Sequence, residues 1–284
     1  HPHPGRSTPS GYRGNRGLSL ARDLDRSLLL SLRRQKEIIN GSLILTPVDS
    51  LPLFTVDAEV ASHFLQGLYV TDKERSDADM LDSKILFAGR TRAAKDVRKI
   101  YSIWAQVLAG ESSSMRLLSG LHAYCAIFMS IGHIGQKVIV LPEVAGGHFS
   151  VKAILDRLGY RTLEMIVDQQ HHCIDIDATL RLMRRERPSF LLVDRSEGLT
   201  YQDLSALARE PYVYGIFDAS QYLPQIISGT YRHPFSRGFS LLVSTLHKSF
   251  PGPQKALVAT RSHDKTWSKL MAGLGRYVSS IHVK

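Results

Sequence analysis

The chain has 284 residues, of which 43% are hydrophobic and 22% are charged, and its formal net charge is +10 at pH 7. This length and composition allow a substantial core, and no apolar run reaches the ~18–20 residues that cross a bilayer. The basic residues are dispersed at helical spacing without interleaved aromatic residues, which argues against nucleic acid or a membrane as a partner. The first residues lack the apolar segment of a signal peptide, and Cys125 and Cys173 form no disulfide framework or metal-binding pair, so we expect a cytoplasmic protein without metal.

The N-terminal third of the chain has two parts. Residues 1–17 are rich in Gly, Pro, Ser, Arg and His without periodicity, which predicts a flexible basic arm. Residues 18–110 form an N-terminal segment of helical and extended stretches. Within it the pattern predicts an extended stretch over 43–54 and helices over 23–39, 56–67 and 92–108.

Residues 111–284 alternate regularly between helices and short apolar strands, and we assign them to one large domain. The predicted strands are 137–141, 162–167, 190–193, 213–218, 239–243 and 256–260, and the predicted helices are 121–131, 150–158, 177–185, 202–208 and one after 266. This order predicts an α/β domain with a mostly parallel sheet that helices cover on both faces. Ligands of such domains bind at the carboxyl ends of the strands.

Two charged residues stand at the carboxyl ends of predicted core strands. Lys248 follows the strand 239–243 and precedes a proline-rich turn, and Asp218 ends the strand 213–218. Each alone is compatible with an ordinary charged strand end. Together they are what pyridoxal phosphate requires, because a lysine holds its aldehyde as a Schiff base and an acid keeps its pyridine nitrogen protonated.

Four other short motifs suit a flat cofactor that carries a phosphate. Ser119-Gly120 precedes a predicted helix, whose free amides favour an anion. Glycines in Gly146-Gly147-His148 would let an imidazole approach a ring. Thr245 and His247 flank the lysine, and Asp194-Arg195-Ser196 offers hydrogen-bonding groups at another strand end. Taken singly, each motif is equally typical of a helix cap or a structural turn.

In this order the motifs resemble those of serine hydroxymethyltransferase, a fold-type I pyridoxal phosphate enzyme. The counterparts of its four motifs are Ser119-Gly120, Gly146-Gly147-His148, Asp218-Ala-Ser-Gln221 and Thr245-Leu-His-Lys248, and Ser249 to Pro253 matches the turn after the family's lysine. The similarity extends from about Leu43 onward. It implies a seven-stranded type of sheet, the large domain of that fold, with the C-terminal small domain absent from this chain. It also implies a homodimer or larger homo-oligomer.

The resemblance also implies the roles of individual residues. Lys248 would form the Schiff base, Asp218 would face the pyridine nitrogen, and His148 would stack on the ring. Ser119 and Gly120 would hold the phosphate with His247 nearby. The complete set expected to bind the cofactor is Ser119, Gly120, His148, Ser196, Asp218, Gln221, Thr245, His247 and Lys248.

Several positions depart from the hydroxymethyltransferase pattern. Gln221 replaces the family's histidine, Leu121 replaces a phosphate-loop serine, and Tyr69-Val-Thr71 stands where the acid–base glutamate is expected. Further departures are Val48-Asp-Ser50 and Phe87-Ala-Gly89. With Ser119-Gly-Leu-His122, Asp194-Arg-Ser-Glu-Gly198 and the run His247 to Lys255, they resemble the threonine transaldolase branch, which includes fluorothreonine transaldolase.

This branch implies an enzyme of natural-product biosynthesis. It would take L-threonine, a β-hydroxy-α-amino acid, release acetaldehyde, and pass the glycyl carbanion to another aldehyde. Alternatives are a tetrahydrofolate-dependent serine hydroxymethyltransferase, an aminotransferase of the same fold, and a catalytically inactive partner subunit. The general base stays open among Asp49, Asp72, His122 and His247.

Overall fold

A computed structural model describes residues 27–38, 41, 90–196 and 201–278 of the chain. The chain divides into two compact units, residues 1–46 and 47–284. In the first unit, residues 27–38 form a helix, within the range expected to be helical. The expected arm 1–17, the extended stretch 43–54 and the helix 56–67 lie outside the described residues.

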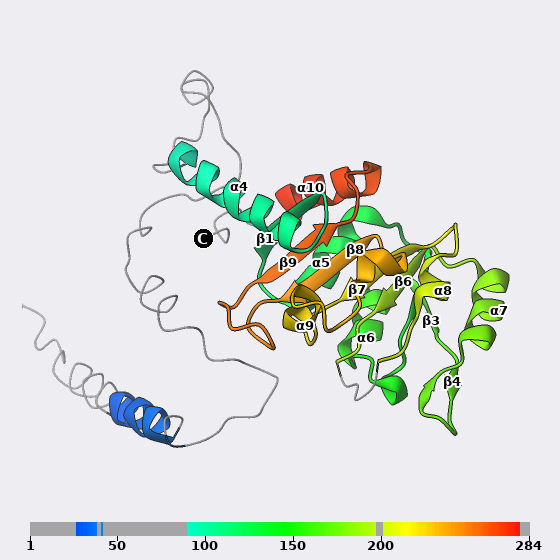
Figure 1. Ribbon diagram of the computed structural model, residues 1–284, viewed down its shortest axis with the longest axis horizontal. Helices are drawn as coiled ribbons and strands as arrows, with labels where there is room; N and C mark the ends of the chain where they lie inside the picture. Colours follow the sequence, from blue (N-terminus) through cyan, green and yellow to red (C-terminus); the bar gives the residue numbers. More distant parts are fainter. Residues whose placement is uncertain (1–26, 39–40, 42–89, 197–200, 279–284) are drawn as a thin grey trace, which may run out of the picture. The chain divides into compact units, whose positions relative to one another are not determined.

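The second unit is built on a seven-stranded sheet with the strand order β1-β9-β8-β7-β6-β2-β3 (Figure 1). The five neighbouring strands from β8 to β3 are parallel, whereas β9 pairs antiparallel with both β8 and β1. The strands are β1 (Ser112–Leu117), β2 (Lys137–Val140), β3 (Arg161–Glu164), β6 (Phe190–Val193), β7 (Tyr214–Asp218), β8 (Leu241–Thr245) and β9 (Ala256–Thr260). A separate two-stranded sheet pairs β4 (Val167–Asp168) with β5 (Cys173–Ile174). The predicted mostly parallel α/β sheet is confirmed.

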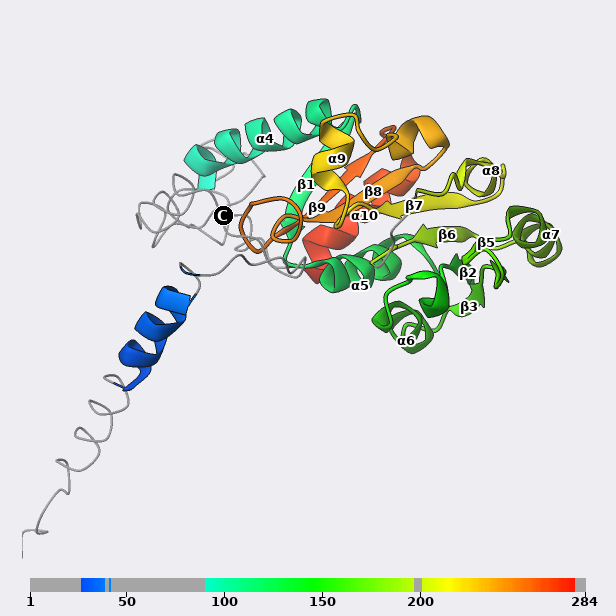
Figure 2. The same cartoon turned by 60° about the horizontal axis from the view of Figure 1, so that its bottom comes forward.

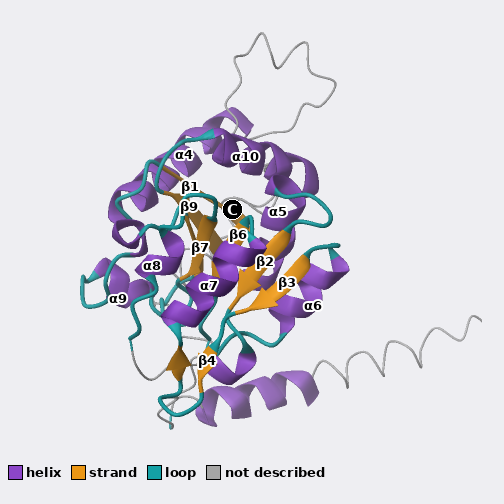
Figure 3. Ribbon diagram, turned by 90° about the vertical axis from the view of Figure 1, so that its right-hand side faces the viewer, coloured by secondary structure: helices purple, strands orange, loops and turns teal. Residues whose placement is uncertain are grey.

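Helices cover both faces of the sheet, as Figures 2 and 3 show. One face packs against α5 (Gly120–Ile131), α6 (Ser150–Arg157) and α10 (Lys265–Tyr277). The other packs against α4 (Arg90–Val107), α7 (Ile176–Glu186), α8 (Ser205–Ala208) and α9 (Leu223–Ile227). Short 3-10 turns are η1 (Glu143–Ala145) and η2 (Pro234–Arg237).

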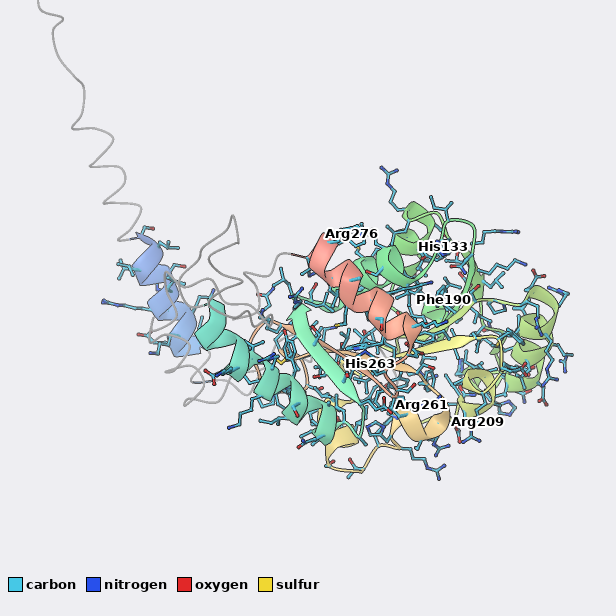
Figure 4. All side chains as sticks on the ribbon, turned by 90° about the horizontal axis from the view of Figure 1, so that it is seen from above. His133, Phe190, Arg209, Arg261, His263 and Arg276 are labelled. Atoms are coloured by element: carbon cyan, nitrogen blue, oxygen red, sulfur yellow. The ribbon has the colours of Figure 1, made fainter. Side chains whose placement is uncertain are left out.

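Side chains alternate in direction along the strands, so each strand contributes residues to a hydrophobic core on either face of the sheet. Leu192 and Ile216 point to the α5 side, whereas their neighbours Val193 and Phe217 point to the α7 side. Phe190, labelled in Figure 4, belongs to the α5 side and makes edge contacts with the rings of Phe128 and Tyr160. The central strands are therefore buried on both faces, which explains their continuous apolar runs.

Several observed elements differ from the sequence prediction, and three of these differences have a clear physical reason or a large extent. The strand predicted over 239–243 is β8, which extends to Thr245 because it pairs with β9 as far as Ala256. The helix predicted over 202–208 is limited to Ser205–Ala208. Strand β1 was not predicted, since its serines give no apolar pattern. It forms by pairing with β9 at the sheet edge, where His263 (Figure 4) has its Nδ1 3.2 Å from the hydroxyl oxygen of Ser112.

In the described part of the chain, no helix has the length and apolar character needed to cross a membrane. Within the same residues, no group of three or more His, Cys, Asp or Glu side chains is arranged to hold a metal ion.

Candidate active site

A cavity of about 500 Å³ opens at the carboxyl ends of β7 and β8, beside the start of α5. A volume of this size is typical of a small-molecule site. All nine residues predicted from the sequence line it: Ser119, Gly120, His148, Ser196, Asp218, Gln221, Thr245, His247 and Lys248. The structure therefore brings together side chains from segments up to 129 residues apart. Leu121, Tyr124, Phe149 and Ser220 line it as well.

Asp218 is fixed at the end of β7 by two hydrogen-bond donors. The backbone N–H of Ser220 donates to its Oδ1 at 2.7 Å, and the Tyr124 hydroxyl donates to its Oδ2. Burial, with Asp218 and Asp194 close by, raises the pKa of Tyr124 well above its ordinary value, so its hydroxyl stays protonated. Two donors on one carboxylate hold its orientation.

Lys248 lies in a turn that the backbone holds tightly. The N–H of Gly252 donates to the carbonyl of Leu246 at 2.7 Å, and the N–H of Leu246 donates to the carbonyl of Lys255 at 2.9 Å. A Cβ atom at Gly252 would lie 2.7 Å from the Leu246 carbonyl oxygen, so the turn needs glycine. This geometry fixes the backbone from which Lys248 reaches the cavity.

His148 is positioned by the turn that joins β2 to α6. A Cβ atom at Gly147 would lie 2.2 Å from the carbonyl oxygen of Leu141, which explains the second glycine of the motif. The N–H of His148 donates to Asp194 Oδ2 at 3.0 Å, and its Nδ1 accepts from the N–H of Ser150 at 3.2 Å. Burial and the nearby Lys248 lower the pKa of His148, which favours a neutral imidazole.

The His148 ring has an aromatic neighbour that the sequence prediction missed. It stacks on Phe149, with ring centroids 4.7 Å apart and an interplanar angle of 19°. Phe149 is 71% exposed and directly follows the glycine-glycine-histidine motif. An exposed phenylalanine beside a cavity is unusual enough to be noticed, but only the fold shows that it lies there.

The start of α5 provides groups for an anion. Ser119 is the N-cap, and its hydroxyl accepts from the N–H of His122 at 3.2 Å. A Cβ atom at Gly120 would lie 3.5 Å from Thr245 Cγ2, so the glycine leaves room at the cavity wall. Among the described residues, the buried Thr245 Oγ1 and His247 Nδ1 have no hydrogen-bond partner. Unpaired polar atoms beside a helix N-terminus and a lysine fit a phosphate group.

Three serines connect the segments that form the cavity. The hydroxyl of Ser220 accepts from the N–H of Thr245 at 2.9 Å, and its carbonyl accepts from the hydroxyl of Ser249 at 2.9 Å. Ser196 donates from its N–H to the carbonyl of Gly146 at 2.9 Å. Ser220 was not predicted because a serine after a strand carries no distinctive signal.

The candidate bases have different positions. His247 lines the cavity. His122 is absent from the cavity wall, and its Nδ1 accepts from the N–H of Leu118 at 3.1 Å. Asp49 and Asp72 lie outside the described residues, as do the departures at 48–50, 69–71 and 87–89.

No family model matches the chain. In sequence it is 24% identical over 229 residues to the serine hydroxymethyltransferase of Sulfolobus acidocaldarius, covering 78% of this chain and 52% of that protein. It is 30% identical over 177 residues to the fluorothreonine transaldolase of Streptantibioticus cattleyicolor, covering 61% of this chain and 27% of that protein. The chain thus spans about half, or less, of the length of these curated relatives.

In structure, the chain is similar to the crystal structure of an L-threonine transaldolase from Pseudomonas fluorescens in the internal aldimine state. The TM-score is 0.78 at 20% identity, and the match covers 95% of this chain and 61% of that chain. The fold expected from the sequence, that of the pyridoxal phosphate-dependent transferases, is confirmed. The expected relation to serine hydroxymethyltransferases and threonine transaldolases is confirmed as well.

Proposed function

We propose that this chain, a relative of the serine hydroxymethyltransferases and threonine transaldolases, binds pyridoxal 5′-phosphate and acts as a transaldolase on a β-hydroxy-α-amino acid. L-threonine is the proposed donor, and its glycyl unit passes to another aldehyde in secondary metabolism. The observation that carries the proposal is that Asp218, at the end of β7, and Lys248, in the turn after the neighbouring parallel strand β8, line one cavity together with the N-terminus of α5.

The cavity residues fit the parts of this cofactor one by one. Lys248 offers the amine for the aldehyde, and Ser119, Gly120, Thr245 and His247 offer donors for the phosphate. When bound, the cofactor supplies an electron sink for the pair released as the Cα–Cβ bond of the substrate breaks. The roles of these residues are part of the proposal.

The remaining side chains keep the charges of the site in place. Asp218, held by Tyr124 and Ser220, presents a negative charge that keeps a proton on the ring nitrogen. A neutral His148 would face the cofactor ring without adding a second positive charge beside Lys248. Of the candidate bases, His247 lines the cavity, but we assign it to the phosphate, so the proposal names no residue that removes the β-hydroxyl proton.

The comparisons also support a second candidate function, folate-dependent serine hydroxymethyltransferase, because the similarity to the Sulfolobus acidocaldarius enzyme covers 78% of this chain and that to the fluorothreonine transaldolase covers 61%. Leu121 and Gln221, which depart from that family's pattern, both line the cavity and favour the transaldolase. An inactive partner subunit is the third possibility. The unpaired Cys125 and Cys173 support the cytoplasmic setting that we include in the proposal.

We expect the purified chain, incubated with pyridoxal phosphate and L-threonine, to release acetaldehyde, measured by coupled reduction with alcohol dehydrogenase and NADH. Release should increase when an acceptor aldehyde is added and should not respond to tetrahydrofolate. Serine cleavage that depends on tetrahydrofolate would instead support the hydroxymethyltransferase. A chain that stays colourless with the cofactor and releases nothing would support the inactive subunit.

We also propose that the chain assembles as a homodimer through an apolar groove beside the cavity. The groove lies between α5 and α6, includes Cys125, Ala153 and Ile154, and shares the exposed Phe149 with the cavity. Its continuity with the cavity favours a second copy, because a partner seated there would also close the site.

Light scattering should therefore give about twice the chain mass of 31.7 kDa. Ala153→Asp, which places a charge in the groove, should shift the mass toward the monomer. Ser268→Asp on the exposed side of α10 is the matched control and should stay dimeric. A dimer that tolerates Ala153→Asp would rule out this surface, and a monomeric wild type would rule out the dimer.

A further inference from the structure

Two carboxylates lie next to each other below the cavity. Val193 pairs with Phe217 in the parallel ladder of β6 and β7, and Asp194 and Asp218 are the next residues along the two strands. Because side chains alternate, both point to the α5 side of the sheet, like Leu192 and Ile216 two residues earlier. Asp194 is 3% exposed and Asp218 is 9% exposed. Ionising both of these neighbouring, buried carboxyl groups would cost a large amount of free energy.

The hydrogen bonds decide which of the two carboxyl groups keeps a proton. Asp218 accepts from two donors, Tyr124 and Ser220. Asp194 accepts from one, the N–H of His148 at 3.0 Å, and its Oδ1 has no partner in the described part of the structure. Burial is the main cause that raises the pKa of Asp194 to about 8. The hydrogen bond from His148 lowers this pKa, and the nearby Asp218 raises it further. Of the two carboxyl groups, Asp194 is therefore the one that favours its protonated form.

We propose that Asp194 is a positioning residue that works as a neutral acid: it holds the backbone of His148 over the cavity while leaving the only negative charge of the pair on Asp218. The protonated carboxyl keeps one oxygen as an acceptor for His148 and turns the other into a donor. The effect on cofactor binding rests on the proposed function, because it requires His148 to contact the cofactor. The protonation state itself does not depend on that function.

The other titratable groups around Asp194 leave this assignment intact. Tyr124 on α5 stays a neutral phenol, since burial raises its pKa. Burial and the positive Lys248 lower the pKa of His148 and favour its neutral form, while the negative Asp218 and Glu143 oppose this shift. Arg195, the neighbour of Asp194 in sequence, lines a different hollow with Tyr201 and Phe217, on the opposite side of the sheet.

The first test compares the thermal stability of wild type and Asp194→Asn as a function of pH. A carboxyl whose pKa is higher in the folded state than its ordinary value of 3.8 binds an extra proton in the folded protein between the two values. Its contribution to stability is fully present below about pH 4 and is lost as the pH rises toward 8. Asparagine stays neutral and cannot lose this contribution.

The Tm of Asp194→Asn relative to wild type should therefore rise by at least about 5 °C between pH 5 and pH 8. Asp177→Asn, which removes an exposed carboxylate on α7, is the matched control and should show no such rise. A difference that stays level or falls across this range means that Asp194 is ionised in the folded protein, and it overturns the proposal.

Carbon-13 NMR of aspartate-labelled wild type gives a second readout, which does not require the Asp194→Asn variant to fold. One carboxyl signal of the wild type should titrate with a midpoint near the pKa of about 8 assigned to Asp194. If every aspartate carboxyl of the folded protein titrates below pH 6, the neutral acid is excluded.

The positioning of His148 is tested by affinity for pyridoxal 5′-phosphate at pH 7. Asp194→Ala removes the acceptor of the His148 N–H and should weaken binding about tenfold, whereas Asp194→Asn keeps an acceptor and should stay within about threefold of wild type. Equal affinities for all three proteins would rule out the positioning role. A wild type that binds no cofactor counts against the proposed function, while the stability and NMR measurements still decide the charge of Asp194.

Discussion

Replacing Lys248 by alanine is expected to abolish the visible absorbance that wild type gains on adding pyridoxal phosphate, and to lower L-threonine cleavage at least about a hundredfold. The colour requires a Schiff base to a lysine amine, and Lys248 is the lysine that lines the cavity. The phosphate-binding groups at Ser119, Thr245 and His247 remain, so the variant should still bind the cofactor weakly without colour. Absorbance titration and equilibrium dialysis measure the two effects separately.

Lys255 is the matched control for this experiment. It is 7% exposed, its amine has no partner among the described residues, and burial lowers its pKa to about 8. Such an amine is more nucleophilic at neutral pH than an exposed lysine, but it does not line the cavity. Lys255→Met should therefore keep the colour. If Lys248→Ala keeps the wild-type spectrum and Lys255→Met loses it, the Schiff base has been assigned to the wrong lysine.

Asp218→Asn is expected to lower kcat about 10²–10³-fold while changing cofactor affinity much less. Asparagine has nearly the same shape and can still pair with Tyr124 and Ser220, but it carries no negative charge. A bound cofactor would then lack the negative charge that keeps its ring nitrogen protonated, and it would accept electrons less well. Steady-state kinetics with L-threonine and a cofactor titration of the same preparation give kcat and affinity side by side.

Asp177→Asn, on the exposed surface of α7, controls for the general loss of a carboxylate and should behave as wild type. Full activity in Asp218→Asn would rule out the charge as the source of catalysis at this position. A loss confined to cofactor binding, with normal kcat at saturation, would instead give Asp218 a role in binding alone.

The elements that the sequence predicted best are those in which local pattern and tertiary packing agree. The strands over 190–193 and 256–260 are found at the predicted residues, because β6 and β9 are short apolar runs buried on both faces. Helix α5 begins one residue before its predicted start, since Ser119 caps it through its own side chain. The position of Asp218 and Lys248 at one cavity could be predicted for a related reason: parallel strands place their carboxyl ends at one edge of the sheet.

The elements that were missed depend on partners far away in the sequence. Strand β1 is rich in serine, and its ladder to β9 spans more than a hundred residues. Tyr124 looks like one more core residue of an apolar helix until β7 brings Asp218 to its hydroxyl. The same holds for Asp194. Its sequence position predicts only an acidic residue at the end of a strand, and the pairing of β6 with β7 is what places Asp218 beside it.

The sequence by itself determined the α/β class, the order of most strands and helices, and which lysine, acid and histidine line the cavity. These follow from periodicity and from motifs whose residues are neighbours in the chain. Only the tertiary structure decided which polar atoms stay unpaired, which carboxyl group keeps its proton, and which side chains complete the cavity wall. Those properties depend on burial and on distances between atoms of different strands, and no local pattern encodes them.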